Sequence, residues 1–232
     1  MGFRFSPRIV TDGLIYYVDA ANRNSYVSGS TMAYSLASDK YDGTLYSGVT
    51  YSDNSFEFDG VDGYIGIGEV IELKSVQKCS YQFWVKKKSS FTSGVWILGR
   101  TIPLYDTVAS YFDSSGRVAS ILYYGSMRTN NSIPLNTWVN IAMVYDGSLS
   151  GNSNRVKIYI DGVLQATTSI GSIIPATTGP GTSNFAIGGL GTATTPSGYF
   201  NGNINNVKIY NRALTAEEIN QNYNTLKGRF GL

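Results

Sequence analysis

The stretch that most constrains the fold lies close to the C-terminal end, at residues 200–219, and reads FNGNINNVKIYNRALTAEEI. It combines an apolar strand, a tight exit and the start of a short helix. Thr215 is followed three residues later by Glu218, which is the spacing of a reciprocal capping box. One face of the helix is then marked by Ile219, Tyr223 and Leu226. A strand that leads into one small helix predicts an all-β domain that closes on itself.

Strand-like runs recur along the rest of the chain, with turn residues between them. They lie at residues 13–20, 43–49, 55–67 (with the turn DGVDG inside), 80–86, 95–99, 108–112, 118–124, 138–145, 156–160, 163–168 and 185–189. The run at 138–145 is apolar on both faces, which predicts a central strand. Asp161-Gly162 predicts a hairpin turn of the primed type. The pattern predicts a two-sheet antiparallel β-sandwich of the jelly-roll class with one short C-terminal helix.

The chain has 232 residues, which fits one large β domain. Residues 171–198 are rich in Gly, Thr, Ser and Pro, but the strands on either side are needed for one sheet system. We therefore expect an N-terminal arm at residues 1–12, a single domain at 13–226 and a C-terminal tail at 227–232.

Composition removes several functional classes. The net charge is only +2, without the concentrated basic stripe that nucleic-acid binding needs. Histidine is absent and Cys79 is the only cysteine, which excludes imidazole catalysis, an intrachain disulfide and a thiolate zinc site. The sequence has neither a signal-peptide pattern nor an apolar run long enough to span a membrane, so we expect neither export by a signal peptide nor membrane insertion.

Five segments, in this order, resemble the concanavalin A-like, laminin-G-like jelly-roll domains, in the branch common in bacterial and phage proteins. They are GLIYYVDAAN (13–22), DGTLYSGVTYSDNSFEFDGVDGYIGI (42–67), SYQFWVK (80–86), WVNIAMVYDGS (138–148) with VKIYIDGVLQ (156–165), and the closing stretch at 200–219. The resemblance implies a recognition module without catalysis, since members bind glycans or proteins, and many bind calcium. Because a fold does not fix a function, the site has to be argued separately.

Glu57, Asp59 and Asp62 spell E-x-D-x-x-D. Laminarinase-like glucanases resemble this fold and use E-x-D-x-x-E on one strand, where the two Glu residues are nucleophile and acid/base. Here the third position is the shorter Asp, and the motif runs into the turn DGVDG. We favour a structural turn over a catalytic pair, and expect no enzyme activity.

The same acidic turn offers a second role. Asp59 and Asp62, with main-chain carbonyls, are ligands of the kind Ca²⁺ takes. Many relatives have a second Asp where this chain has Gly63, and acidic residues where it has Asn205-Asn206. We therefore expect no cofactor, with Ca²⁺ at Asp59 and Asp62 as the alternative.

Exposed aromatic rings beside hydrogen-bonding groups are what sugar binding requires. The cluster that best fits this in the sequence is Trp96, Tyr105, Asp106, Tyr111, Tyr123 and Tyr124. The other interpretation, which we favour from sequence, is ordinary sandwich packing with a tyrosine-rich surface.

Both ends of the chain carry Arg and Phe together. Because exposed apolar groups often mark a contact, we expect assembly contacts at Phe3, Arg4, Phe5, Arg8, Arg229 and Phe230. The alternative, of equal weight, is that the ends fold back on their own domain.

The function predicted from these observations is a non-enzymatic structural or attachment protein of a viral particle. Tailed-phage capsid decoration or tail association rests on the family resemblance. The predicted partners are other virion structural proteins, with multiple copies or a homo-oligomer on the particle and no nucleic acid, and the predicted location is the virion. The alternative is a lectin for host or environmental polysaccharide, and a glucanase is the least favoured.

Overall fold

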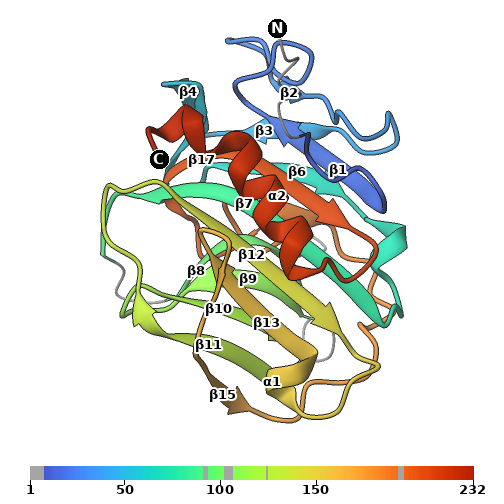
Figure 1. The fold of residues 1–232 in the computed structure, drawn as a ribbon. Coiled ribbons are helices and arrows are strands. Elements are labelled where there is room, and N and C mark those ends of the chain that lie inside the picture. The colour runs from blue at the N-terminus through green and yellow to red at the C-terminus, as the bar shows by residue number, and fades with distance from the viewer. Residues whose placement is uncertain (1–7, 91–93, 102–106, 124, 193–195) are drawn as a thin grey trace, which may run out of the picture.

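The computed structural model describes residues 8–232 apart from 91–93, 102–106, 124 and 193–195. Two antiparallel sheets pack face to face as a sandwich, and one helix lies on the outer face of the first sheet (Figure 1). This confirms the predicted fold class. Within the described residues, no helix is both long and apolar enough to cross a membrane.

The first sheet, sheet A, is built around the closing strand β17 (Asn201–Tyr210). Its order is β14 (Val163–Leu164), β13 (Val156–Ile160), β12 (Val139–Asp146), β7 (Lys78–Lys87), β17, β5 (Ser55–Asp59) and β4 (Thr50–Ser52). On the edge of β17 that faces away from β7, the first half of the strand pairs with β5 and the second half pairs with β1 (Leu14–Asp19). Between these halves, the register of β17 against β7 shifts between Ile204 and Asn206, which is a β-bulge at Asn205.

The second sheet, sheet B, has nine strands within the described residues. Their order is β15 (Thr167–Gly171), β11 (Gly125–Ser132), β10 (Arg117–Leu122), β9 (Val108–Phe112), β8 (Val95–Arg100), β16 (Phe185–Ile187), β6 (Tyr64–Gly68), β3 (Gly43–Tyr46) and β2 (Met32–Ala33). Side chains alternate across the sheet. Ile65 and Ile67 of β6 are buried in the core between the sheets, whereas Tyr64 and Gly66 belong to the outer face.

Helix α2 (Ala216–Leu226) covers the outer face of sheet A. Its first turn is closed by the predicted capping box of Thr215 and Glu218. Ile219 packs with residues from β12, β13 and β17 in a second apolar cluster. A buried amide network also ties the helix to β7, because Asn222 donates to Gln82 Oε1 at 2.7 Å and to the Tyr210 hydroxyl at 3.0 Å.

Both ends of the described chain pack near this helix. Val10 is buried, its backbone N–H donates to Asn222 Oδ1 at 2.8 Å, and its carbonyl accepts from the Tyr210 hydroxyl. After α2, the chain forms the short 3-10 helix η2 (Lys227–Phe230). The smaller helices are η1 (Ile71–Leu73) and α1 (Asn152–Arg155).

Candidate functional site

Two tyrosines stand side by side on the outer face of sheet B. Strands β3 and β6 pair antiparallel, with Tyr46 opposite Tyr64 and Thr44 opposite Gly66. The two phenol rings stack with their centroids 4.5 Å apart and their planes within 12°. Tyr46 is 44% exposed. A Cβ atom on Gly66 would lie 3.1 Å from Cε2 of Tyr46, so the absence of a side chain there leaves room for this ring.

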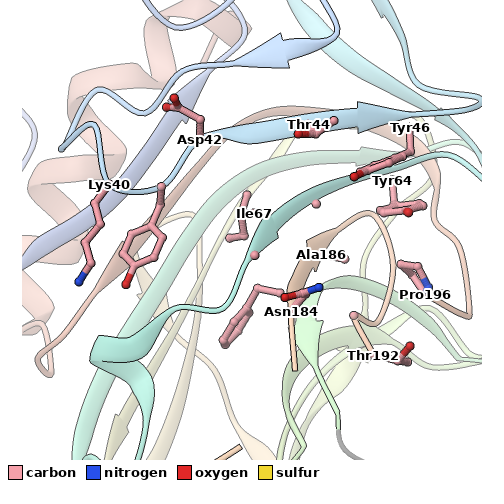
Figure 2. A pocket seen from close by; sticks show the side chains of 15 residues that line it. Lys40, Asp42, Thr44, Tyr46, Tyr64, Ile67, Asn184, Ala186, Thr192 and Pro196 are labelled. Atoms are coloured by element: carbon pink, nitrogen blue, oxygen red, sulfur yellow. The ribbon is translucent and has the colours of Figure 1, made fainter. Parts of the chain in front are cut away.

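These tyrosines line a hollow of about 390 Å³. Figure 2 shows them on neighbouring strands, with Pro196 and Thr192 across from them. Further polar lining comes from Thr44 of β3 and from the loop residues Lys40, Tyr41, Asp42 and Asn184. We call this hollow the groove. It joins flat apolar rings to hydroxyl and amide groups that can donate and accept hydrogen bonds.

Aromatic rings continue across the sheet beyond the groove. The ring of Tyr199 lies 6.3 Å from that of Tyr64, and its hydroxyl donates to the Pro196 carbonyl at 2.7 Å. Farther on, Trp96 of β8 and Tyr111 of β9 face each other at 4.7 Å between centroids. Together these five residues form what we call the aromatic row.

Gly198 connects the two parts of the row. Its carbonyl accepts from the Trp96 backbone N–H at 2.9 Å, and it has the positive φ of 62° that favours glycine. A Cβ atom there would lie 2.4 Å from Cδ1 of Trp96. The indole ring of Trp96 therefore packs directly against the backbone of Gly198, where a side chain would clash with it.

An ion pair lies beside the end of the groove that is formed by Lys40 and Tyr41, away from the stacked tyrosines. Lys40 and the Tyr41 hydroxyl both contact the carboxylate of Glu72. Burial alone would raise the pKa of Glu72, but these two donors together lower it. Burial raises the pKa of Tyr64, and its neighbours Tyr46 and Tyr199 add to that effect, so its phenol is uncharged at neutral pH.

The structure brings together part of the glycan-binding cluster predicted from sequence. Trp96 and Tyr111 are in contact and belong to the row. Tyr123 follows β10 with a φ of +59°, and its backbone N–H donates to the Thr107 carbonyl at 2.8 Å. Tyr105, Asp106 and Tyr124 lie outside the described residues.

Sequence reasoning missed Tyr46, Tyr64 and Tyr199. Part of the signal was present in the sequence. Neighbouring side chains of a strand point to opposite faces, so Tyr46 lies on the face opposite Leu45 and Tyr64 on the face opposite Ile65. What the sequence alone does not supply is the pairing of β3 with β6, which places the two rings opposite each other.

The acidic residues of the E-x-D-x-x-D motif lie at the end of β5 and in the turn that follows it. Asp59 ends β5, and its Oδ1 accepts from the backbone N–H groups of Val61, Asp62 and Gly63. Burial alone would raise its pKa, but these hydrogen bonds together lower it. Asp62 Oδ1 accepts from the Gly48 N–H at 3.2 Å. The predicted Ca²⁺ ligands thus hold turn backbone, and the described residues contain no group of three or more acidic or thiol side chains placed to hold a metal.

Glu57 lies on sheet A, on the strand face opposite the buried Phe56 and Phe58, and forms an ion pair with Lys88. The motif therefore leaves the strand after Asp59, as the turn interpretation expects.

The predicted assembly contacts fall into two groups. Phe3, Arg4 and Phe5 lie outside the described residues. In the second group, the Arg8 carbonyl accepts from Gln221, Arg229 pairs with Asp19, and Phe230 stacks on Trp84 at 4.0 Å between centroids. These described ends pack against their own domain, which was the alternative expected from sequence. A role in assembly stays a prediction.

The comparisons with known proteins agree on the fold. A family model described as the concanavalin A-like lectin/glucanases superfamily matches residues 58–220. No curated protein matches the sequence.

Solved structures with similar folds include enzymes and parts of enzymes. Trypanosoma rangeli sialidase aligns with a TM-score of 0.68 and 16% identity, over 94% of this chain and 33% of its own. The chain thus spans about a third of the length of these sialidases. Domain 4 of AbnA, an extracellular arabinanase from Geobacillus stearothermophilus solved with arabinotriose, aligns with a TM-score of 0.64 and 19% identity, over 90% of this chain and 98% of that domain.

Proposed function

The chain belongs to the concanavalin A-like lectin/glucanase superfamily, and from that premise we propose that it is a non-enzymatic carbohydrate-binding module. The observation that carries the proposal is the aromatic row with the groove at one end. Flat rings stack on the apolar faces of sugars, while hydroxyl and amide groups beside them fix the orientation of a ligand. The groove supplies both kinds of group on one sheet face.

The row favours an extended glycan. Its rings are spread over β3, β6, β8, β9 and the segment before β17, so successive sugar units would meet successive rings. Lys40 is neutralised by Glu72, and Asp42 is the acidic side chain among the described residues of the groove. This balance favours neutral sugars over acidic ones. The similar arabinanase domain was solved with arabinotriose, a neutral oligosaccharide, which supports the same class of ligand.

Two observations support a role without hydrolysis. Glycoside hydrolysis uses two carboxyl groups that flank the scissile bond. The described lining of the groove offers one, Asp42, whereas Glu57 and Asp59 lie on sheet A. The absence of histidine removes the other common general base.

A glycan microarray that carries neutral and acidic oligosaccharides tests the proposal. We expect the protein to bind neutral glycans, and Tyr64→Ala to raise the dissociation constant about tenfold, because the stacked pair of tyrosines in the groove loses one of its two rings. Tyr34→Ala is the matched control, because Tyr34 is 52% exposed and lies outside the groove. Silence of the wild-type protein on the array, or equal binding by both variants, would contradict the proposal.

A place on a viral particle, and the bacterial and phage branch of the family, stay predictions from the sequence. The two roles are compatible, since a glycan-binding module on a capsid or tail would attach the particle to polysaccharide. Antibody labelling of released particles in the electron microscope would test the location. Gold on the capsid or tail would support it, and unlabelled particles would count against it.

A further inference from the structure

A second hollow, of about 350 Å³, lies on the other side of the molecule. It opens on the outer face of sheet A, beside the β-bulge of β17 and under η2. Bulges are over-represented next to sites, because they re-aim side chains. The side chains that matter here are Asp53, Asn54, Trp138, Asn205, Arg229 and Phe230.

Two polar groups of this hollow are held in place from behind. Arg229 Nη1 donates to both carboxylate oxygens of Asp19 at 2.8 Å, and Asp19 is fully buried. Asn205 Nδ2 donates to the Asn54 carbonyl at 2.6 Å, and its Oδ1 accepts from Asn206 at 2.7 Å. Side chains fixed in this way lose little conformational entropy when a ligand binds.

The same hollow has spare hydrogen-bonding capacity. Among the described residues, Nε and Nη2 of Arg229 have no acceptor and the Asp53 carboxylate has no donor. The amide nitrogen of Asn54 is also unpaired within the described part of the chain, where its Oδ1 accepts from Tyr51. Donors and an acceptor therefore stand together around one space.

An aromatic wall completes the hollow. The rings of Trp138 and Phe230 lie 4.9 Å apart at an angle of 46°. Lys86 Nζ lies 5.2 Å from the centroid of Trp138, so a cation also borders the wall. Apolar ring edges beside planar amide, carboxylate and guanidinium groups are the side chains that hold a hydroxyl-rich ligand.

We propose that this hollow is a second carbohydrate site, which takes a single neutral sugar unit by its vicinal hydroxyls. Each hydroxyl both donates and accepts, so one neighbouring pair can donate to Asp53 and accept from Asn54 and Arg229. The spare carboxylate of Asp53 disfavours acidic sugars and phosphates, because like charges repel. Arg229 is paired with Asp19, and the ammonium of Lys86 beside Trp138 balances the carboxylate of Asp53, so the lining has no net charge and suits a neutral sugar.

The two sites face away from each other, since the groove belongs to sheet B and this hollow to sheet A. One molecule would then join two glycan chains without forming a dimer. This consequence, unlike the second site itself, rests on the proposed function of the groove.

The three tryptophans give a test that separates the sites. Indole N–H signals of Trp138, Trp96 and Trp84 report the hollow, the aromatic row and the buried face under α2, and each can be assigned with its Trp→Phe variant. The probes are glucose, galactose, mannose and arabinose, added to the full chain at millimolar concentrations. We expect one of them to shift the Trp138 signal in a saturable way. An unchanged Trp138 signal with all four sugars overturns the inference, whatever Trp96 does.

Asp53→Asn sharpens the result. Asp53 has a φ of +50° in a hairpin turn, a conformation that Asn also tolerates, so the fold is kept while the charge is removed. We expect the sugar concentration that half-saturates the Trp138 shift to rise about tenfold. Asp62→Asn, in a different exposed turn, is the control that should leave it unchanged. If Asp53→Asn binds as well as the wild type, the assigned site is wrong. If the groove and the aromatic row bind no sugar but the hollow does, the Trp96 signal stays unchanged while the Trp138 signal shifts.

Discussion

Lys208 is a cation buried on the outer face of β17, with only 1% of its surface exposed. Its Nζ donates to Asn206 Oδ1 at 2.6 Å and lies 4.8 Å from the ring centroid of Tyr17. Burial lowers the pKa of Lys208 to about 7; Asp19 opposes the shift and Arg229 adds to it. The domain therefore contains a lysine that loses its proton near neutral pH when folded.

This residue predicts how stability depends on pH. An unfolded lysine keeps its proton up to about pH 10, so between pH 7 and pH 8.5 the unfolded chain binds more protons than the folded one. Stability must then rise with pH. We expect the free energy of unfolding to increase by about 2 kcal/mol over this window, since one pKa unit corresponds to about 1.4 kcal/mol.

Urea unfolding of wild type and Lys208→Met at both pH values measures this effect. The variant keeps the length of the side chain and removes the titration, so its stability should change far less. The window stops at pH 8.5 because burial raises the pKa of Cys79 to about 12, which acts in the opposite direction above that point. Equal slopes for the two proteins would show that Lys208 does not titrate in this range.

Individual residues of the candidate site were predictable only where a local pattern marked them. Trp96 and Tyr111 were predicted as a cluster and are in contact. The stacked pair of Tyr46 and Tyr64 was not, because their contact depends on which strands pair across 18 residues of chain. Long-range register is set by tertiary packing and leaves little trace in a single segment.

At the scale of elements, patterns of neighbouring residues predicted the ends and turns correctly. The capping box was predicted from the spacing of Thr215 and Glu218, and both of its hydrogen bonds are present. The hairpin at Asp161-Gly162 has positive φ at both residues, as a turn of the primed type requires. These features depend on two to four neighbouring residues, so the sequence contains what determines them.

The predicted strand at 163–168 shows where local reasoning stops. The structure divides it into β14 of sheet A and β15 of sheet B, so the chain passes from one sheet to the other at residues 165–166. Strands β2, β4 and β11 were also missed. The first two have three residues or fewer, and β11 contains the run Arg-Thr-Asn-Asn-Ser, in which Thr129 is the single strand former.

The cap of α2 makes a prediction at this scale. Thr215→Ala removes the side chain that accepts from the Glu218 N–H. We expect the free energy of unfolding to fall by about 1 kcal/mol, because an orphan donor in the first turn loses its partner. Chemical denaturation at neutral pH measures it.

Thr225→Ala is the control for this substitution. Thr225 lies in the last turn of the same helix, and its hydroxyl donates to the Gln221 carbonyl at 2.8 Å. Since alanine is the better helix former, this change should leave stability within about 0.5 kcal/mol of the wild type. A loss equal to that of Thr215→Ala would mean that the cap contributes nothing of its own.

On the scale of the whole molecule, the sandwich separates its two outer faces. Sheet A carries α2, the amide network and the end of the chain, whereas the groove and the aromatic row lie on sheet B. The all-β class, the sandwich and the C-terminal helix were predicted from the sequence and are confirmed. The groove was not, because it forms from three strands and the loops beside them, which are distant along the chain.

The proposed function requires a glycan to bind along the aromatic row of sheet B. Mapping backbone amide shifts during titration with a glycan identified on the array tests it most directly. We expect the largest shifts at residues 44–46, 64–66, 96, 111 and 184–186, on the strands that carry the row and the groove. Shifts confined to α2 and to the open edge strands β14 and β15 would contradict it.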